Sequence, residues 1–222
     1  MAWLMRKSIA REDSPMVNWT PETIEEILKS NAEVVARYPH LSMDHPEFLA
    51  KGGAATGHHT RMPERPHEAV VEELFGPLPD ALTSSIVNDR IKNAVEAIEP
   101  GVHQFIPTII TMPDGSRDAS WWAMRICHSI DAIAAEHCVD FHEYRPKPTE
   151  YPDYFLYRSN EDNRMRVAVY KDRLARKAIW WDWRFQHTFF SEQLGQYFLD
   201  NSVRGYCLPV DELKRSMHVI EV

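Results

Sequence analysis

The chain has 222 residues, of which 44% are hydrophobic and 26% charged, and its formal net charge is −8. This balance is typical of a globular protein with a substantial core, organised as one large domain or two small ones. The acidic charge disfavours nonspecific nucleic-acid binding, and no apolar run approaches the about 20 residues that span a bilayer. The three cysteines form no CxxC pair, and Arg6 and Lys7 come too early for a secretory signal, so we predict a cytoplasmic protein.

The first predicted elements are a short strand from Trp3 to Ile9 and the clearest helix of the chain. Thr20 is a good N-cap for this helix, and Pro21 suits the first helical position. The next proline, Pro39, ends the helix. Apolar residues at helical spacing predict a stripe that faces the core: Ile24, Ile27, Leu28, Val35 and Tyr38.

A glycine-rich region follows this helix. Gly52, Gly53 and Gly57 lie close together, but no lysine follows them as in a phosphate-binding P-loop, and no clear strand precedes them. We therefore interpret residues 51–61 as an irregular loop. Residues 66–75 predict a short helix, closed by a Gly-Pro pair.

A capped helix, a break and a strand are predicted within residues 87–110. Asn88 is the expected N-cap, and Pro100-Gly101 stops the helix. The strand that follows contains Pro107, for which we expect an edge or bulged position. The buried face of the helix is predicted from the spacing i, i+3, i+4, i+7: Ile91, Ala94, Val95 and Ile98.

Residues 190–209 repeat this pattern. Ser191 occupies the N-cap position, Leu194 and Phe198 occupy core positions, and Cys207-Leu208-Pro209 corresponds to the strand. We therefore predict two similar helix–turn–strand units, with chance similarity as the alternative.

Further strands are predicted between and after these units. Pro113-Asp114-Gly115 predicts the tight turn of a hairpin whose second strand covers residues 121–126. Strands at residues 154–157 and 165–170 are predicted to pair, and a third strand at residues 178–183 completes an antiparallel meander.

Candidate metal ligands are few. Cys138, Asp140 and His142 alternate, so they would share one face of a strand, and Cys127 and His128 would join them only through the tertiary fold. Structural zinc normally takes four nitrogen or sulfur ligands with closely spaced pairs, so we predict no metal and no cofactor. The chain contains neither GxSxG nor HExxH, and we predict no catalytic residues.

Asp182 stands between Trp181 and Trp183. In a central strand this carboxylate would need a buried partner, such as Arg184, or a bound group. On an edge strand it would face water, and this is the reading that we favour.

Residues 87–107, the hairpin after them and the segment FFSEQLGQYFLDNSVRGYCLPVDEL resemble immunity protein family eleven of bacterial polymorphic toxin systems. The resemblance covers roughly Asp80 to Leu213 and rests on spaced apolar, glycine and proline positions. Helices and hairpins that come in runs predict an α+β fold, with an antiparallel or mixed sheet and helices on its faces. We divide the chain into an N-terminal helical and irregular region, residues 1–79, packed on an immunity-like domain, residues 80–222.

The resemblance implies a protein that binds a cognate bacterial toxin and neutralises it by occluding the toxin's active surface, without being an enzyme. The net negative charge favours a toxin with a basic surface. Two alternatives stay open. One is a small enzyme whose site is assembled from scattered residues such as Cys138, Asp140 and His142; the other is an adaptor or structural domain without a toxin partner.

The predicted partner contacts are Asp153, Tyr154, Glu161 and Asp162. Aromatic anchors concentrate binding energy at interfaces, and loops tolerate the sequence change that specificity for a varying toxin demands. In the alternative reading, Tyr154 packs under the strands and the acidic turn is merely solvated. The glycine-rich loop at residues 51–61 is the second candidate surface.

Overall fold

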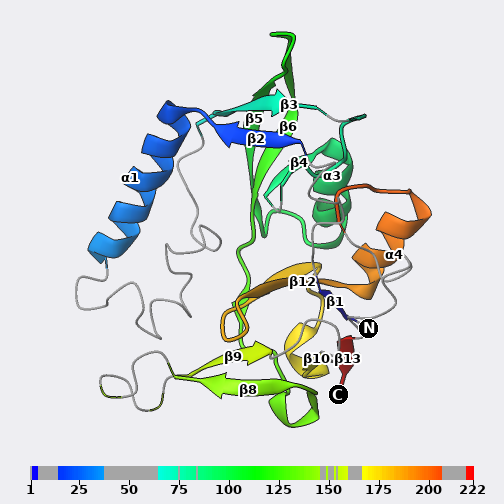
Figure 1. Cartoon of the computed structure of the whole chain (residues 1–222). Coiled ribbons are helices and arrows are strands. Elements are labelled where there is room, and N and C mark those ends of the chain that lie inside the picture. The colour runs from blue at the N-terminus through cyan, green and yellow to red at the C-terminus, as the bar shows by residue number, and fades with distance from the viewer. Residues whose placement is uncertain are drawn as a thin grey trace.

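A computed structural model describes residues 2–4, 15–37, 65–74, 76–83, 85–145, 149, 153, 155–159, 167–206 and 219–222. Within these residues, helices and strands are mixed along the chain, and the strands form mixed and antiparallel sheets (Figure 1). The protein is therefore α+β, which confirms the predicted fold class.

The larger sheet has five strands in the order β2-β3-β5-β6-β4. β3 and β5 run parallel, whereas the other neighbours are antiparallel, so this sheet is mixed. Its strands are β2 (Met16–Trp19), β3 (His67–Glu73), β4 (Ile86–Asn88), β5 (Gln104–Thr111) and β6 (Arg117–Arg125).

The second sheet has four strands in the order β1-β12-β11-β7. β11 is an inner strand that pairs antiparallel with β12 and parallel with β7. The strands are β1 (Ala2–Leu4), β7 (Ser129–Ile130), β11 (Ile179–Asp182) and β12 (His187–Ser191).

Two strand pairs complete the sheets. β8 (Phe141–Tyr144) pairs antiparallel with β9 (Leu156–Ser159), and β10 (Val167–Val169) pairs parallel with β13 (Val219–Glu221). The predicted antiparallel meander is therefore wrong, because β9, β10 and β11 each pair with strands from other parts of the chain. Single-sequence patterns locate strands better than they choose the partners of those strands.

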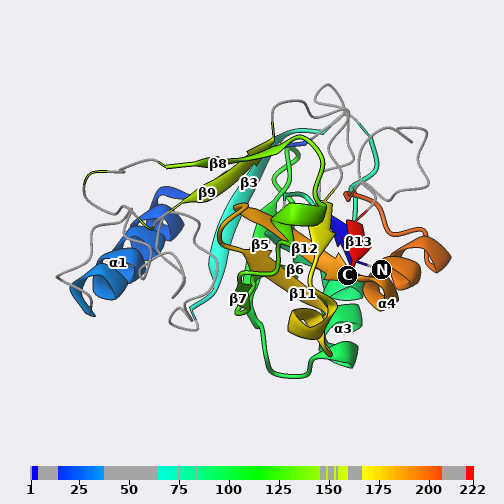
Figure 2. The same ribbon diagram turned by 90° about the horizontal axis from the view of Figure 1, so that it is seen from below.

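Of the three α-helices within the described residues, two cover the junction of the two larger sheets. α3 (Asp89–Ile98) and α4 (Glu192–Asp200) lie next to one another in Figures 1 and 2, whereas α1 (Pro21–Arg37) projects away. The short 3-10 helices are η2 (Ala135–His137) and η3 (Lys171–Leu174). None of the helices in the described ranges combines the length and apolar character needed to cross a membrane.

The apolar faces of α3 and α4 meet in one core that both sheets share. Burial of this core holds the sheets together at the helix junction. Its members include residues of both helices, of β6 and the residue after it, and of β11 and β12: Ile91, Val95, Met124, Ile126, Ile179, Phe190, Leu194 and Phe198.

The predicted N-caps of α3 and α4 are confirmed. The side chain of Asn88 accepts hydrogen bonds from the first turn of α3, and Ser191 accepts one from the backbone N–H of Leu194 in α4. Phe198 is buried as expected, but Ile98 is only half-buried. The strand of the second unit, at residues 207–209, lies outside the described residues, so the repeat of two whole units stays a prediction.

The predicted hairpin is confirmed at the β5–β6 turn. The backbone N–H of Met112 donates to the carbonyl of Ser116 at 2.8 Å, and Gly115 takes a positive φ of 82°. Pro107 lies in β5, which is an inner strand, so the edge position is wrong. The pairing of β5 with β3 begins at Thr108, one residue after Pro107. Pro107 therefore precedes the β3–β5 ladder, and its missing N–H interrupts no hydrogen bond between these two strands. The register between β5 and β6 shifts just after this point, between Thr108 and Ile110.

The helix predicted at residues 66–75 is wrong, because this segment is strand β3. Its burial alternates along the strand: Ala69 and Val71 are buried, whereas Glu68 and Glu72 are exposed. Alternation with a period of two is the strand pattern, and the run of glutamates obscured it.

The predicted buried stripe of α1 is also wrong. Ile24 is 45% exposed and Leu28 61% exposed, and only Ile27 packs against the sheet, beside Ile106. The start of the helix is tied to β3, because the backbone N–H of Glu68 donates to the Thr23 hydroxyl at 2.8 Å. Helical spacing marks an apolar face but does not state what covers it. The side chains of Val35 and Tyr38 lie outside the described part of the chain.

Strands from both sides of the proposed domain boundary share the five-stranded sheet. β2 and β3 precede residue 80, and β4, β5 and β6 follow it. The division at residues 79 and 80 stays a prediction. The opening strand is observed over Ala2–Leu4, and the rest of its predicted range is outside the described residues.

Candidate functional site

Asp153 is the one predicted partner contact within the described residues, and its neighbours in the chain are the strands β8 and β9, which form a two-stranded ribbon that protrudes from the rest of the structure in Figure 1. Asp153 is exposed in the connection between the two strands. Tyr154, Glu161 and Asp162 lie outside the described residues.

Arginine and aromatic side chains pair along the described part of this ribbon. The guanidinium of Arg158 lies 3.9 Å from the ring centre of Tyr144, and both side chains are exposed. The guanidinium of Arg184 lies 4.1 Å from the ring centre of Phe155, which directly precedes β9. Cation–π contacts of this kind restrict the positions of the arginine side chains.

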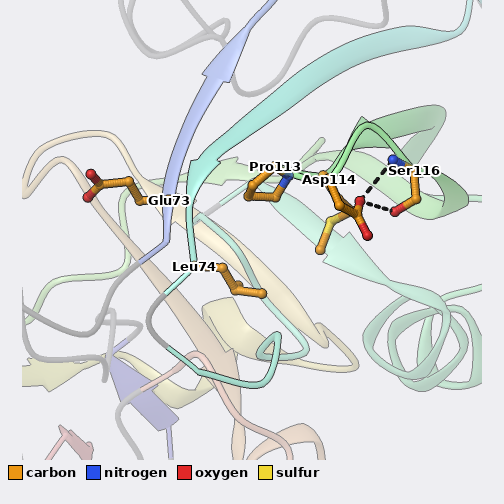
Figure 3. Close-up of a pocket in the computed structure, with 6 residues that line it drawn as sticks. Glu73, Leu74, Pro113, Asp114 and Ser116 are labelled. Atoms are coloured by element: carbon orange, nitrogen blue, oxygen red, sulfur yellow. Dashed lines mark hydrogen bonds between the residues drawn. The ribbon is translucent and has the colours of Figure 1, made fainter.

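A second surface feature is a groove of about 420 Å³ beside the β5–β6 turn (Figure 3). Its wall is formed by the residues that follow β3 and by the turn itself. The lining residues are Glu73, Leu74, Met112, Pro113, Asp114 and Ser116.

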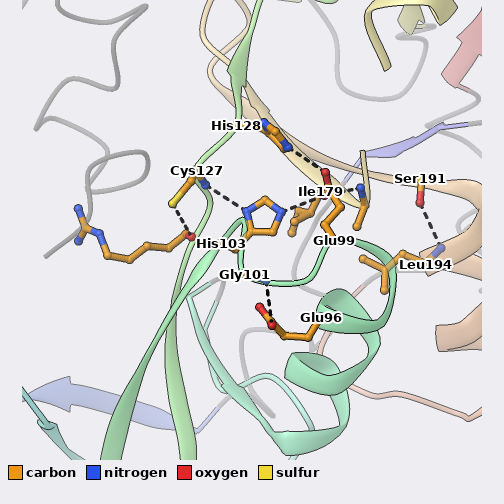
Figure 4. A network of polar contacts seen from close by, with 11 residues as sticks. Glu96, Glu99, Gly101, His103, Cys127, His128, Ile179, Ser191 and Leu194 are labelled. Atoms are coloured by element: carbon orange, nitrogen blue, oxygen red, sulfur yellow. Dashed lines mark hydrogen bonds and ion pairs between the residues drawn. The ribbon is translucent and has the colours of Figure 1, made fainter. Parts of the chain in front are cut away.

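A buried polar cluster lies where α3 ends (Figure 4). Glu99 is the C-cap of α3 and is only 6% exposed. Nε2 of His103 lies 3.0 Å from Oε2 of Glu99, and Nε2 of His128 lies 2.8 Å from Oε1. The two imidazole rings meet edge to face, with their centres 5.4 Å apart. We name Glu99, His103 and His128 the Glu99 clasp.

The Glu99 clasp joins the two larger sheets. The backbone N–H of Ala178 donates to Oε2 of Glu99 at 2.5 Å, and that of Ile179 approaches the same oxygen at 3.4 Å. These two residues enter β11 of the four-stranded sheet, whereas His103 directly precedes β5 of the five-stranded sheet. One carboxylate therefore satisfies donors from both sheets.

The backbone fixes the tautomer of His103. The N–H of Cys127 donates to Nδ1 of His103 at 3.1 Å, so Nδ1 carries the lone pair and Nε2 carries the proton. Nε2 of His103 therefore donates to Glu99, which holds the ring in place.

The pKa of Glu99 reflects two opposed effects. Burial on its own raises it, but the hydrogen bonds from His103, His128 and Ala178 outweigh burial and lower the pKa to about 2. Glu99 is thus a carboxylate at neutral pH, and its hydrogen bonds are charge-assisted.

The ligand-type atoms of the Glu99 clasp lie within 4.8 Å of one another, a spacing that can hold a metal ion. The hydrogen bonds do not fit this use, because Nε2 of His103 is protonated and would have to lose the bond from Cys127 to become a ligand. A buried carboxylate with a pKa of about 2 is also a weak general base. The arrangement therefore fits a structural clasp better than a reactive centre.

The predicted set of Cys138, Asp140 and His142 does not share one face of a strand, so that prediction is wrong. Cys138 lies before β8, and its sulfur accepts the backbone N–H of Ala168 at 3.2 Å. Asp140 takes a positive φ of 61°, which interrupts the extended backbone, and His142 is exposed on β8.

The edge position favoured for Asp182 is wrong as well. Asp182 is fully buried in the inner strand β11, and its oxygens accept backbone N–H bonds from Ala132 at 2.7 Å and Phe185 at 2.8 Å. Burial raises the pKa of Asp182 to about 7, although the hydrogen bonds from the backbone act to lower it. Arg184 is not its partner, because Arg184 pairs with Asp131 at 2.6 Å.

Sequence patterns did not reveal the Glu99 clasp. Glu99 and His103 stand four positions apart, but Pro100-Gly101 breaks the helix between them, so helical spacing does not place them together. His128 reaches them from the far end of β6. The one available signal was a glutamate at a helix end with a histidine soon after it.

Comparison with known families decides the identity of the chain. The sequence profile of the immunity protein family Imm11 matches residues 14–208. The chain belongs to the Imm11 family of immunity proteins. The Imm11 match begins well before Asp80, so it includes β2, α1 and β3, which the resemblance in the sequence did not cover. It also includes the Glu99 clasp and the β8–β9 ribbon. None of the curated proteins compared with the chain matches it.

Proposed function

We propose that this Imm11 protein binds a cognate bacterial toxin and neutralises it by covering the toxin's active surface. The observation that carries this proposal is the family match over residues 14–208. The proposal assigns no catalytic activity to the chain, in keeping with the scattered positions of Cys138, Asp140 and His142. We also propose that the toxin is bound in the cytoplasm, because the cysteine pattern of the sequence fits a reducing compartment.

The proposed contact surface is the β8–β9 ribbon with its flanking residues Asp153, Tyr154, Glu161 and Asp162. Exposed arginine and aromatic side chains on the ribbon support this choice, because such side chains dominate binding energy at protein interfaces. The three carboxylates would face a basic surface of the toxin.

Charge complementarity is expected to act mainly on association. The net charge of −8 attracts a basic partner over long range, and this attraction raises the association rate more than it slows dissociation. Association with a basic toxin should therefore slow as the salt concentration rises.

The contact surface is tested with Asp153→Lys and with the double variant Glu161→Lys, Asp162→Lys. We expect slower association with the toxin and weaker protection of cells, at an unchanged melting temperature. The matched control for Asp153→Lys is Glu25→Lys, which makes the same change of charge at an exposed position on α1. Full affinity in both test variants would place the interface elsewhere, with residues 51–61 the next candidate.

A further inference from the structure

The buried carboxylate of Asp182 joins two separate segments of the chain. Oδ2 of Asp182 accepts the backbone N–H of Ala132 at 2.7 Å and that of Ile133 at 3.2 Å, in the segment that follows β7. Oδ1 accepts the N–H of Phe185 at 2.8 Å, in the turn between β11 and β12. Each oxygen therefore holds one of the two segments in place.

Each of these segments also carries one member of an ion pair. Nε of Arg184 donates to Oδ2 of Asp131 at 2.6 Å, and the two side chains are 19% and 31% exposed. Asp131 directly precedes Ala132, and Arg184 directly precedes Phe185, so each partner is next to a backbone N–H that Asp182 holds. The relative position of the two partners therefore depends on the carboxylate of Asp182.

The turn between β11 and β12 contacts both strands of the β8–β9 ribbon. The carbonyl of Arg184 accepts the backbone N–H of Tyr157 in β9 at 2.9 Å, and its guanidinium donates to the carbonyl of Phe155 at 3.2 Å. The ring centre of Phe185 lies 4.8 Å from that of Phe141 in β8. The main chain of β9 and a side chain of β8 are thus attached to this turn.

Much of the β8–β9 ribbon faces solvent. The side chains of His142, Glu143 and Tyr144 on β8 are exposed, and so is that of Arg158 on β9. Each strand has only 4 residues, and a two-stranded ribbon is marginally stable on its own. The orientation of the ribbon therefore depends strongly on its attachment to the rest of the protein.

We propose that Asp182 is a positioning residue for the toxin contact: its carboxylate fixes the Asp131–Arg184 pair and the turn at Phe185, and these hold the β8–β9 ribbon in one orientation. A contact surface that is already ordered loses less conformational entropy on binding, so Asp182 raises affinity without touching the toxin. This role rests on the function proposed above, which makes the ribbon the toxin surface.

The test is the order of the β8–β9 ribbon in Asp182→Asn, measured on the whole chain as amide order parameters from residual dipolar couplings. The pH is about 8, above the pKa of about 7, so that the wild type carries the carboxylate. An asparagine side chain accepts only at its oxygen, so one of the two segments loses its bond. We expect the order parameters of Glu143, Tyr144 and Arg158 to fall from about 0.85 to under about 0.6. Ile106 in the five-stranded sheet should keep the wild-type value, which a general loosening of the fold would lower as well.

A second variant, Asp131→Asn, decides the question if Asp182→Asn does not fold. It removes the charged partner of Arg184 at a partly exposed position and should loosen the same ribbon amides. The matched control is Asp172→Asn, the same change at an exposed position in η3, which should leave the ribbon as in the wild type. Ribbon order that is unchanged in either folded variant, or already under about 0.6 in the wild type, would overturn the proposal. Order parameters are measured without a toxin, so a failure here is distinguishable from a failure of the proposed immunity function.

Discussion

Nε2 of His128 lies 2.8 Å from Oε1 of Glu99, and this contact joins the segment after β6 to the C-terminal end of α3. The other carboxylate oxygen accepts from His103 and from the backbone that enters β11. A single buried side chain therefore links both larger sheets to α3. The Glu99 clasp is thus a structural centre of the protein.

Glu99→Gln should lower the free energy of unfolding by about 3–5 kcal/mol, because an amide cannot accept hydrogen bonds at both of its ends and leaves buried donors without a partner. Urea unfolding measures the change. The control is Glu96→Gln on the same helix, where an exposed bond to the N–H of Gly101 is altered. The control should change stability by less than about 0.5 kcal/mol. Equal effects of the two substitutions would show that the clasp adds nothing.

The Glu99 clasp also predicts a pH dependence. The pKa of Glu99 is lowered from 4.5 to about 2 in the folded protein. The ionised carboxylate of Glu99 therefore contributes to the free energy of unfolding above pH 4.5, and this contribution is lost as the pH falls toward 2. The lowering of the pKa corresponds to about 3 kcal/mol. Unfolding free energies of wild type and Glu99→Gln should converge by about this amount between pH 5 and pH 2. A difference that stays constant over this range would contradict the assignment.

Phe198→Ala should destabilise the protein by about 3–5 kcal/mol, through lost burial and the cavity that remains. Phe198 is 2% exposed in the core shared by α3, α4 and both sheets. The contrasting variant is Leu28→Ala on α1, where the side chain is largely exposed, and it should cost under about 1 kcal/mol. Thermal and urea unfolding measure both. A larger effect for Leu28→Ala would mean that this face of α1 is covered in solution.

Gly205→Ala should be more destabilising than Gly115→Ala, although both glycines have positive φ. A Cβ on Gly205 would lie 2.5 Å from the carbonyl oxygen of Ala81 and 2.8 Å from its Cβ, whereas a Cβ on Gly115 meets nothing within 4 Å. Gly115→Ala should therefore cost only about 1 kcal/mol of backbone strain, and Gly205→Ala distinctly more. Similar unfolding midpoints for the two variants would contradict the close approach of these segments.

Local sequence signals predicted the parts of the fold that local physics determines. The caps at Asn88 and Ser191 and the turn at Pro113 were read correctly, because each depends on hydrogen bonds or φ values within a few residues. The pairing of β9 with β8 and of β10 with β13 depends on contacts between distant segments, which no local pattern records.

The polar sites were harder to predict for the same reason. Asp182 is buried because β11 lies between two other strands, and its partners are backbone N–H groups that have no sequence signature. The Glu99 clasp draws its members from three separate segments. Membership of the immunity family, by contrast, was visible in spaced apolar, glycine and proline positions, because these record the fold as a whole.

Binding and neutralisation of a cognate toxin, as proposed above, can be measured in cells and with purified proteins. The direct measurement is the growth of cells that express a candidate toxin domain, sought in the reading frames next to the gene of this protein, with and without this chain, together with the activity of the purified toxin as the chain is titrated in. We expect restored growth and loss of toxin activity at a one-to-one ratio, with weaker protection by Asp153→Lys than by Glu25→Lys. Growth arrest that the chain does not relieve, or a complex in which the toxin stays fully active, would contradict it.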